Sequence, residues 1–403
     1  MLKYLTQKTF KQDFWNNIIL LPIDLALIFC STFSGQNKTV YEIPFFLFSW
    51  IVIFALRRNF FLSQAEISAQ IFVVFALMPI FIQFYKYNFD YYFGAISVIL
   101  YVNILVFGAY VIERLLSDSP GCKLVRWLPA ISLIILGFLA HQFSGNDPRQ
   151  SLIFGPNIYY RIVGSIFLLN LVLVHDNYSG KKDKISFFSL LTTILCLIIA
   201  LFIMIKTGSR GAAVVGCMLT ISFLYTVLYI RLKWLRFANI TIIFALCGLI
   251  LKSSFSESIF DSRVFWFYDR GASSGSISAR QGFWENLPSF FIKDNYLFGE
   301  GSDYIYSYPH NLYLDILYNG GLLPCVILLI FTIIYGILLC KGKLNRNWKI
   351  LTLICSPIYI GSLFSGTIYN NYSVISLIFI LPLFIQNKDQ TISKIPPKNK
   401  IFL

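Results

Sequence analysis

The feature that most constrains this chain is a series of twelve apolar runs spread along its whole length. Eleven of the runs are about 15–21 residues long and one, 310–340, is longer, so each is long enough for an α-helix to cross the hydrocarbon core of a bilayer. A helix pairs its own backbone N–H and C=O groups, so it can lie in lipid without leaving them unsatisfied. The predicted spans are 15–33, 43–60, 67–85, 92–112, 127–143, 158–175, 186–206, 211–230, 237–251, 310–340, 350–368 and 372–386.

The composition points to the same fold class. Hydrophobic residues make up 57% of the 403 positions and charged residues 13%, whereas soluble domains average about 25% charged residues. The first span contains Pro22 and Asp24 and no clear cleavage site follows it, so we interpret it as a permanent helix rather than a secretory signal. For Asp24 we expect a structural role. The sequence predicts an all-α, polytopic helical membrane protein in which residues 1–403 form a single integral-membrane domain.

The Lys and Arg residues are concentrated on alternate connecting segments. If the amino terminus is cytoplasmic, most of the 33 Lys and Arg residues face the cytoplasm, as the positive-inside rule requires. Both termini are therefore predicted to be cytoplasmic. The same distribution accounts for the net charge of +14, so we expect no nucleic-acid partner. No Cys or His spacing indicates a metal site, and we expect neither a metal nor a cofactor.

The stretch 252–309 is the only long segment between two spans, the ninth and the tenth. It carries an aromatic cluster at 265–268, a flexible run GASSGS at 271–276 and a predicted helix that begins at Ser278 and is kinked near Pro288. Disordered segments are poor in aromatic residues. We therefore expect 252–309 to form a small helical cap on the outer, periplasmic side.

A polar motif, KTGSRGA at Lys206–Ala212, precedes the eighth span. Thr207 or Ser209 can cap the helix that follows, and Gly211 lets the backbone approach a ligand closely. The free N–H groups of a helix amino terminus, together with the guanidinium of Arg210, suit a phosphate. The alternative is that Arg210 only extends its charge towards lipid headgroups.

A second motif, SYPHNLYLDILYNGG at Ser307–Gly321, opens the tenth span. His310 follows a proline that suits a first helical position, and the positive end of the helix dipole disfavours the imidazolium form there. We therefore expect His310 to be neutral and able to accept a proton, although a structural hydrogen bond is an equal alternative.

Two further observations concern the predicted outer side of the bundle. Arg161 lies inside the sixth span, where a charge is costly and is by default a functional candidate; it could equally be a structural partner of Asp315 or Glu42. The outer tyrosines are interpreted mainly as an interfacial belt, and some of them could stack on sugars. They are Tyr85, Tyr87, Tyr91, Tyr92, Tyr159 and Tyr160.

A third motif, SARQGFWENL…DNYLFGEG at Ser278–Gly301, lies between these two, and all three fall between residues 200 and 335. Together they resemble the O-antigen polymerase and O-antigen ligase superfamily of bacterial envelope glycosyltransferases. The other spans match that superfamily only in hydropathy. One departure is Asn319, where many members have a glutamate, so any role of that acid is in doubt here.

The resemblance implies a metal-independent glycosyltransferase that takes a glycan from undecaprenyl pyrophosphate at the periplasmic face of the inner membrane. It implies that His310 is the general base and that Arg210 and Arg280 hold the departing pyrophosphate. The predicted substrate-binding residues are Arg161, Ser209, Gly211, Asn311, Gly299 and Gly301. The implied partners are lipid-linked oligosaccharide repeat units, membrane lipid, and a chain-length regulator and flippase of the same pathway.

The form of the histidine motif favours one member of this superfamily over the other. YPHN and the NGG ending are more typical of a polymerase, which joins lipid-linked repeat units, than of a ligase, which transfers the glycan to lipid A–core. The ligase stays the main alternative. A lipid-linked oligosaccharide flippase or another transporter is less favoured, because the two halves of the sequence show no inverted hydropathy repeat.

Overall fold

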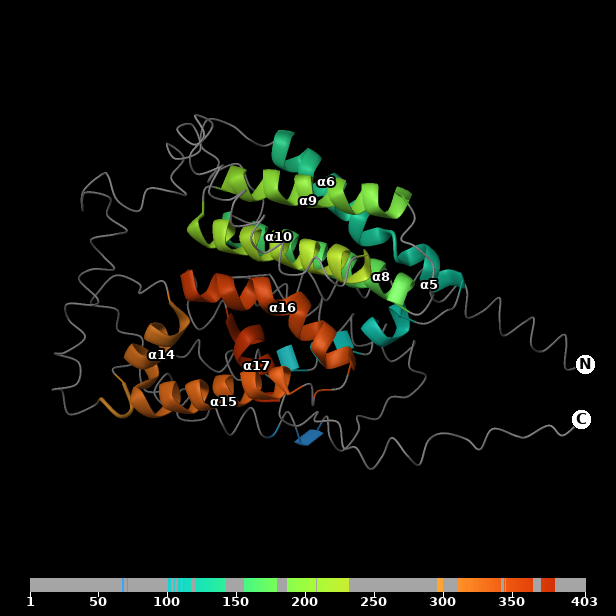
Figure 1. Cartoon of the computed structure of the whole chain (residues 1–403). Coiled ribbons are helices and arrows are strands. Elements are labelled where there is room, and N and C mark those ends of the chain that lie inside the picture. The colour runs from blue at the N-terminus through green and yellow to red at the C-terminus, as the bar shows by residue number, and fades with distance from the viewer. Residues whose placement is uncertain are drawn as a thin grey trace, which may run out of the picture.

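In the computed structural model, the elements of the described part are α-helices joined by turns and irregular residues (Figure 1). The structure describes residues 67, 68, 71, 101, 102, 105, 108, 109, 111–116, 120–142, 156–179, 187–207, 209–231, 296–299, 311–341, 344, 346–364 and 371–380. Its helices are α5 (Pro120–Val125), α6 (Leu128–Gln142), α8 (Pro156–Ser179), α9 (Phe187–Thr207), α10 (Arg210–Arg231), α14 (Leu312–Gly320), α15 (Leu322–Cys340), α16 (Arg346–Phe364) and α17 (Tyr372–Ile380).

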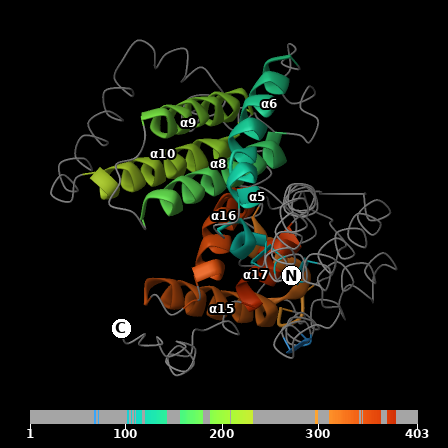
Figure 2. The ribbon, with the colours of Figure 1, turned by 90° about the vertical axis from the view of Figure 1, so that its right-hand side faces the viewer.

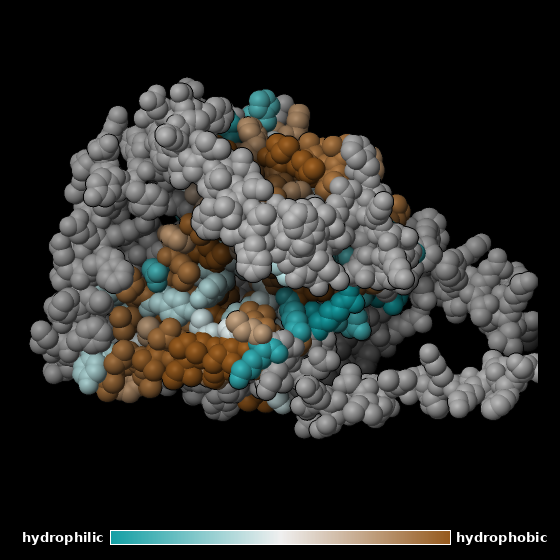
Figure 3. Space-filling view, viewed as in Figure 1, coloured by the Kyte–Doolittle hydropathy of each residue, from teal (hydrophilic) through white to brown (hydrophobic). Residues whose placement is uncertain are grey.

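Four segments in the described part are long and apolar enough to cross a membrane. They are Cys122–His141, Asn157–Asp176, Phe188–Thr207 and Leu322–Cys340. Large apolar side chains such as Phe188, Ile198 and Ile333 are more than half exposed on these helices, and Figure 3 shows apolar surface along α15. Such surface is unfavourable in water and is expected next to lipid tails. These properties confirm the predicted helical fold and are those of a membrane protein.

Helix α8 lies at the centre of the described bundle and packs against α6, α9, α10 and α16 (Figure 2). The apolar stretch of α8 is 78% buried inside the protein, whereas the apolar stretch of α15 is only 17% buried. Close packing at Gly164 contributes to this, because a Cβ there would lie 3.0 Å from both Pro357 of α16 and Val215 of α10. Any residue on the face that α8 presents to α10 and α16 is therefore held between rigid helices.

Four of the predicted spans that fall on described residues are confirmed as helices with closely matching bounds. The predictions 127–143, 158–175, 186–206 and 211–230 agree with α6, α8, α9 and α10 to within four residues. The prediction 350–368 is shifted, because α16 runs from Arg346 to Phe364. The cap at 252–309 lies outside the described residues except for 296–299, and so do Asp24 and the spans 15–33, 43–60 and 237–251.

The tenth predicted span, 310–340, is wrong as a single helix. The structure divides it into α14 and α15 at Gly321, whose φ of 86° lies in the left-handed region that favours glycine. The first N–H groups of α15 have no partner within that helix. They are paired instead by a neighbouring turn, because Leu322 N donates to Tyr296 O at 2.8 Å and Leu323 N donates to Leu297 O at 3.2 Å.

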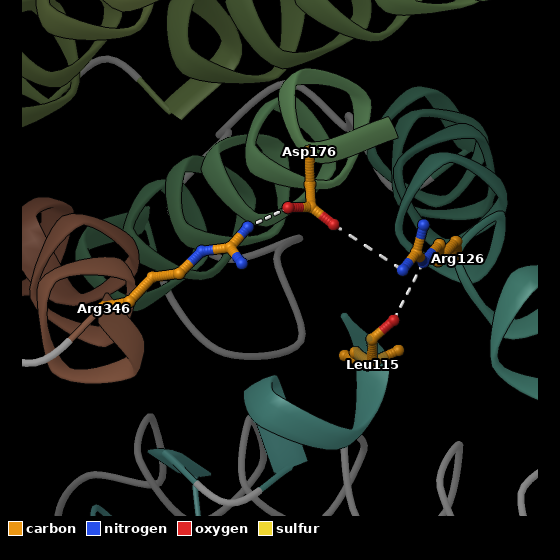
Figure 4. A network of polar contacts seen from close by, with 4 residues as sticks. All are labelled: Leu115, Arg126, Asp176 and Arg346. Carbon is orange, nitrogen blue, oxygen red and sulfur yellow. Dashed lines mark hydrogen bonds and ion pairs between the residues drawn. The ribbon is translucent and has the colours of Figure 1, made fainter. Parts of the chain in front are cut away.

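An ionic cluster joins α8 to α16 and to the turn after α5 (Figure 4). Asp176, near the end of α8, pairs with Arg346 and lies 3.7 Å from a guanidinium nitrogen of Arg126. Arg126 is also held by a 2.8 Å hydrogen bond from Nε to the carbonyl oxygen of Leu115. The side chains of Arg126 and Asp176 are 6% and 13% exposed, whereas that of Arg346 is 63% exposed.

This difference in exposure predicts unequal contributions to stability. Asp176→Ala removes a carboxylate that lies 3.7 Å from the buried Arg126 guanidinium and is expected to cost about 2–3 kcal/mol. Arg346→Ala removes an exposed partner and is expected to cost less than about 1 kcal/mol. Thermal unfolding of the purified protein in detergent measures both variants, and equal destabilisation would contradict a larger contribution from the buried Arg126–Asp176 pair than from the exposed Arg346–Asp176 pair.

Candidate functional site

Helix α10 begins at Arg210, immediately after the break that follows α9. The carbonyl of Ser209 accepts from Ala212 N at 3.0 Å and from Ala213 N at 3.3 Å, which places Ser209 at the N-cap position. Its hydroxyl donates to Asn157 Oδ1 of α8 at 3.0 Å, and the hydroxyl of Thr207 donates back to Met204 O at 2.7 Å. These two bonds fix the turn to α8 and to the last turn of α9.

Gly211 permits α10 to meet α8 without an intervening side chain. A Cβ at Gly211 would overlap the hydroxyl oxygen of Tyr160, and its ring carbon Cζ would be 2.9 Å away. Gly361 of α16 meets the same hydroxyl from another side, where a Cβ would lie 2.9 Å from the oxygen. At Gly211 and Gly361 a larger residue would therefore displace Tyr160.

Arg161 is the charged member of this junction. It is 4% exposed, and a Cβ at Gly361 would overlap its Nε. Its Nη1 donates to Oδ1 of Asn371 at 3.1 Å, and Asn371 is itself fully buried just before α17. A guanidinium with a fixed orientation loses little freedom when it binds an anion, so this arrangement suits either a structural or a ligand-binding arginine.

Asn311 forms the amino-terminal cap of α14. Its Oδ1 accepts from Tyr313 N at 2.9 Å and from Leu314 N at 3.2 Å, and its Nδ2 donates to Leu363 O of α16 at 3.0 Å. Helix α14 begins at Leu312, two residues later than the sequence predicts. The starts of α8, α10 and α14 and the end of α16 are consequently linked at one end of the bundle.

The structure brings together four predicted site residues, Arg161, Ser209, Gly211 and Asn311, through these contacts at that end. Gly299 lies elsewhere, against the backbone of Asn319–Gly321 at the far end of α14. The nine residues of α14 separate it from Asn311 by about 13 Å.

The requirement for glycine at position 299 follows from this packing and from its φ of 76°. Near it, the amide of Asn319 donates to the main-chain oxygen of Asp315 at 2.9 Å and to its carboxylate at 3.2 Å. Asp315 is fully buried. The binding role predicted for Gly299 stays a prediction. His310, Arg280, Gly301 and the side chain of Arg210 lie outside the described residues.

Three residues of this end were not identified from the sequence as parts of the site: Asn157, Tyr160 and Asn371. The polar pair at 370–371 just before an apolar helix was the available signal for Asn371. The prediction that Tyr159 and Tyr160 belong to an interfacial belt is wrong, because they are only 2% and 0% exposed. Both face packed helices, which position in the sequence alone does not reveal.

Comparisons of the chain with protein-family models, with curated proteins and with solved structures find no match. Function therefore has to be inferred from the residues themselves and from their arrangement at the end of the bundle where α8, α10 and α14 begin.

Proposed function

We propose that this protein is a bacterial O-antigen polymerase. It joins undecaprenyl-pyrophosphate-linked repeat units at the periplasmic face of the inner membrane, and both of its termini are cytoplasmic. His310 removes the proton from the acceptor hydroxyl as that hydroxyl attacks the anomeric carbon of the donor glycan. The bond to the pyrophosphate oxygen breaks, and undecaprenyl pyrophosphate leaves as an anion held by Arg210 and Arg280.

The observation that best supports the proposal is the convergence of Arg161, Ser209, Gly211 and Asn311 at one end of an apolar helical bundle. These residues are far apart in the sequence, and the sequence predicts that they bind substrate. A helix amino terminus beside a buried guanidinium is a favourable environment for a phosphate.

The chemistry agrees with the residues proposed for it. A sugar hydroxyl is a weak nucleophile, and a positioned general base typically contributes about 10²–10⁴ in rate. Pyrophosphate is a good leaving group, so it needs charge stabilisation rather than an acid. Arginines can supply the stabilisation that a metal ion supplies in other phosphate-transferring sites.

Deletion of the gene tests the proposal in its native host. We expect the lipopolysaccharide gel ladder to collapse to core carrying a single repeat unit, and expression of the intact chain should restore the ladder. Loss of every attached repeat would indicate the ligase instead. A transporter would be indicated if purified protein in liposomes fails to elongate a lipid-linked repeat but moves it across the bilayer.

A further inference from the structure

We propose that the hydroxyl of Tyr160 donates a hydrogen bond to a phosphoryl oxygen bound at the amino terminus of α10. Under the proposed function, on which this assignment rests, that oxygen belongs to undecaprenyl pyrophosphate. Tyr160 thereby adds a neutral donor to the cationic residues already predicted to bind the leaving group.

The first observation is that this hydroxyl is buried without a partner. Tyr160 is 0% exposed, and within the described part of the chain its hydroxyl oxygen makes no hydrogen bond. Burial of a hydroxyl is unfavourable unless it is hydrogen-bonded, so folded proteins pair nearly all such groups. An unpaired donor at this position is explained if a ligand completes its bonding.

The adjacent tyrosine provides the contrast. Tyr159 is also buried, at 2% exposed, but its hydroxyl donates to the carbonyl oxygen of Leu136 in α6 at 2.7 Å. The two neighbours on α8 therefore point towards different helices. Tyr159 joins α8 to α6, whereas Tyr160 faces α10 and α16.

The direction of the Tyr160 hydroxyl identifies what it faces. Its oxygen lies close enough to overlap a Cβ placed at Gly211, the second residue of α10. Gly211 belongs to the first turn of α10, which begins at Arg210. The hydroxyl therefore lies against the first turn of α10, whose N–H groups attract anions.

Arg161 determines the class of ligand. The Tyr160 hydroxyl and the Arg161 Nε both lie against Gly361, so the hydroxyl and the guanidinium group share one wall of α16. A helix amino terminus, a guanidinium and a hydroxyl donor together favour an oxyanion with several acceptor oxygens, as in a phosphoryl group. The same chemistry is offered by a phospholipid headgroup, so the experiment has to separate these two sources.

The test compares Tyr160→Phe with Tyr159→Phe in the purified full-length protein. Undecaprenyl pyrophosphate is titrated in detergent, and Kd is measured by microscale thermophoresis for both variants and the wild type. Vesicles of phosphatidylglycerol are titrated in parallel. The melting temperature of each ligand-free variant reports its fold.

We expect Tyr160→Phe to raise the Kd for undecaprenyl pyrophosphate about ten-fold or more, with an unchanged or higher ligand-free melting temperature because an unpaired buried hydroxyl is removed. Tyr159→Phe should lower the melting temperature slightly and leave the Kd within about two-fold of wild type. The two substitutions remove the same atom from neighbouring residues. Any effect on Kd that is common to substitutions in α8 should therefore appear in both variants.

Three results would change these conclusions in distinguishable ways. An unchanged Kd in Tyr160→Phe, or an equal loss in Tyr159→Phe, overturns the assignment of Tyr160 and leaves the polymerase proposal intact. Binding of phosphatidylglycerol that depends on Tyr160, without binding of undecaprenyl pyrophosphate, supports an oxyanion site at α10 but contradicts the polymerase proposal. Absence of both kinds of binding overturns the Tyr160 site.

Discussion

Replacement of His310 by alanine is expected to abolish polymer while the protein still accumulates in the membrane. Without a base the acceptor hydroxyl keeps its proton during attack, and the rate should fall by about 10²–10⁴. The cap of α14 is formed by Asn311 rather than by His310, so that helix retains its amino-terminal hydrogen bonds. Polymer is measured on lipopolysaccharide gels of a deletion strain that expresses the variant, with immunoblots of the membrane fraction.

His141→Ala is the matched control for this experiment. His141 is an exposed histidine near the carboxyl end of α6, and the charge distribution places it on the same predicted side as His310. Its loss should leave both the amount and the length of polymer unchanged. A normal ladder in His310→Ala would exclude His310 as the general base.

Gly321→Ala is expected to cause the largest loss of stability among single-methyl additions to the described helices. At φ 86° an alanine is strained, and its Cβ would overlap the backbone of Gly299 and of Leu297. Backbone cannot move aside as a flexible side chain can, so we expect a cost of at least about 2–4 kcal/mol. Thermal unfolding in detergent, together with the amount of protein in the membrane, measures the effect.

Gly336→Ala gives the opposite expectation on the same helix. A Cβ at Gly336 would meet nothing within 4 Å, and the residue lies in the interior of α15. Alanine has the higher helix propensity, by about 1 kcal/mol in water, so this variant should be as stable as wild type or slightly more stable. If the two alanine variants unfold at the same temperature, docking of 296–299 on Gly321 does not contribute to stability.

The predicted site could be located only in part from the sequence. Arg161 stood out because a charge within a span is unusual, and Ser209 and Gly211 because a polar turn interrupts two apolar helices. Asn371 and Tyr160 carried no comparable signal. An asparagine before a helix and a tyrosine near a membrane interface are ordinary in a sequence, and they become notable only through the partners that packing gives them.

The division of 310–340 is another example of this limit. Apolar residues lie on both sides of Asn319, Gly320 and Gly321, and the prediction of one long helix joined the two runs across them. The break depends on hydrogen bonds from Leu322 and Leu323 to carbonyl oxygens of Tyr296 and Leu297, more than twenty residues earlier. A glycine pair makes such a turn possible, but only a segment distant in the sequence stabilises it.

The sequence by itself determined that this chain forms apolar helices and approximately where α6, α8, α9 and α10 begin and end. These properties follow from side-chain hydropathy and backbone pairing within each segment, and both are local. Only the tertiary structure decided which polar groups meet, because that depends on the direction in which each helix presents its side chains. Tyr159 and Tyr160 demonstrate this, since adjacent residues of one type point to different helices and only one hydroxyl finds a described partner.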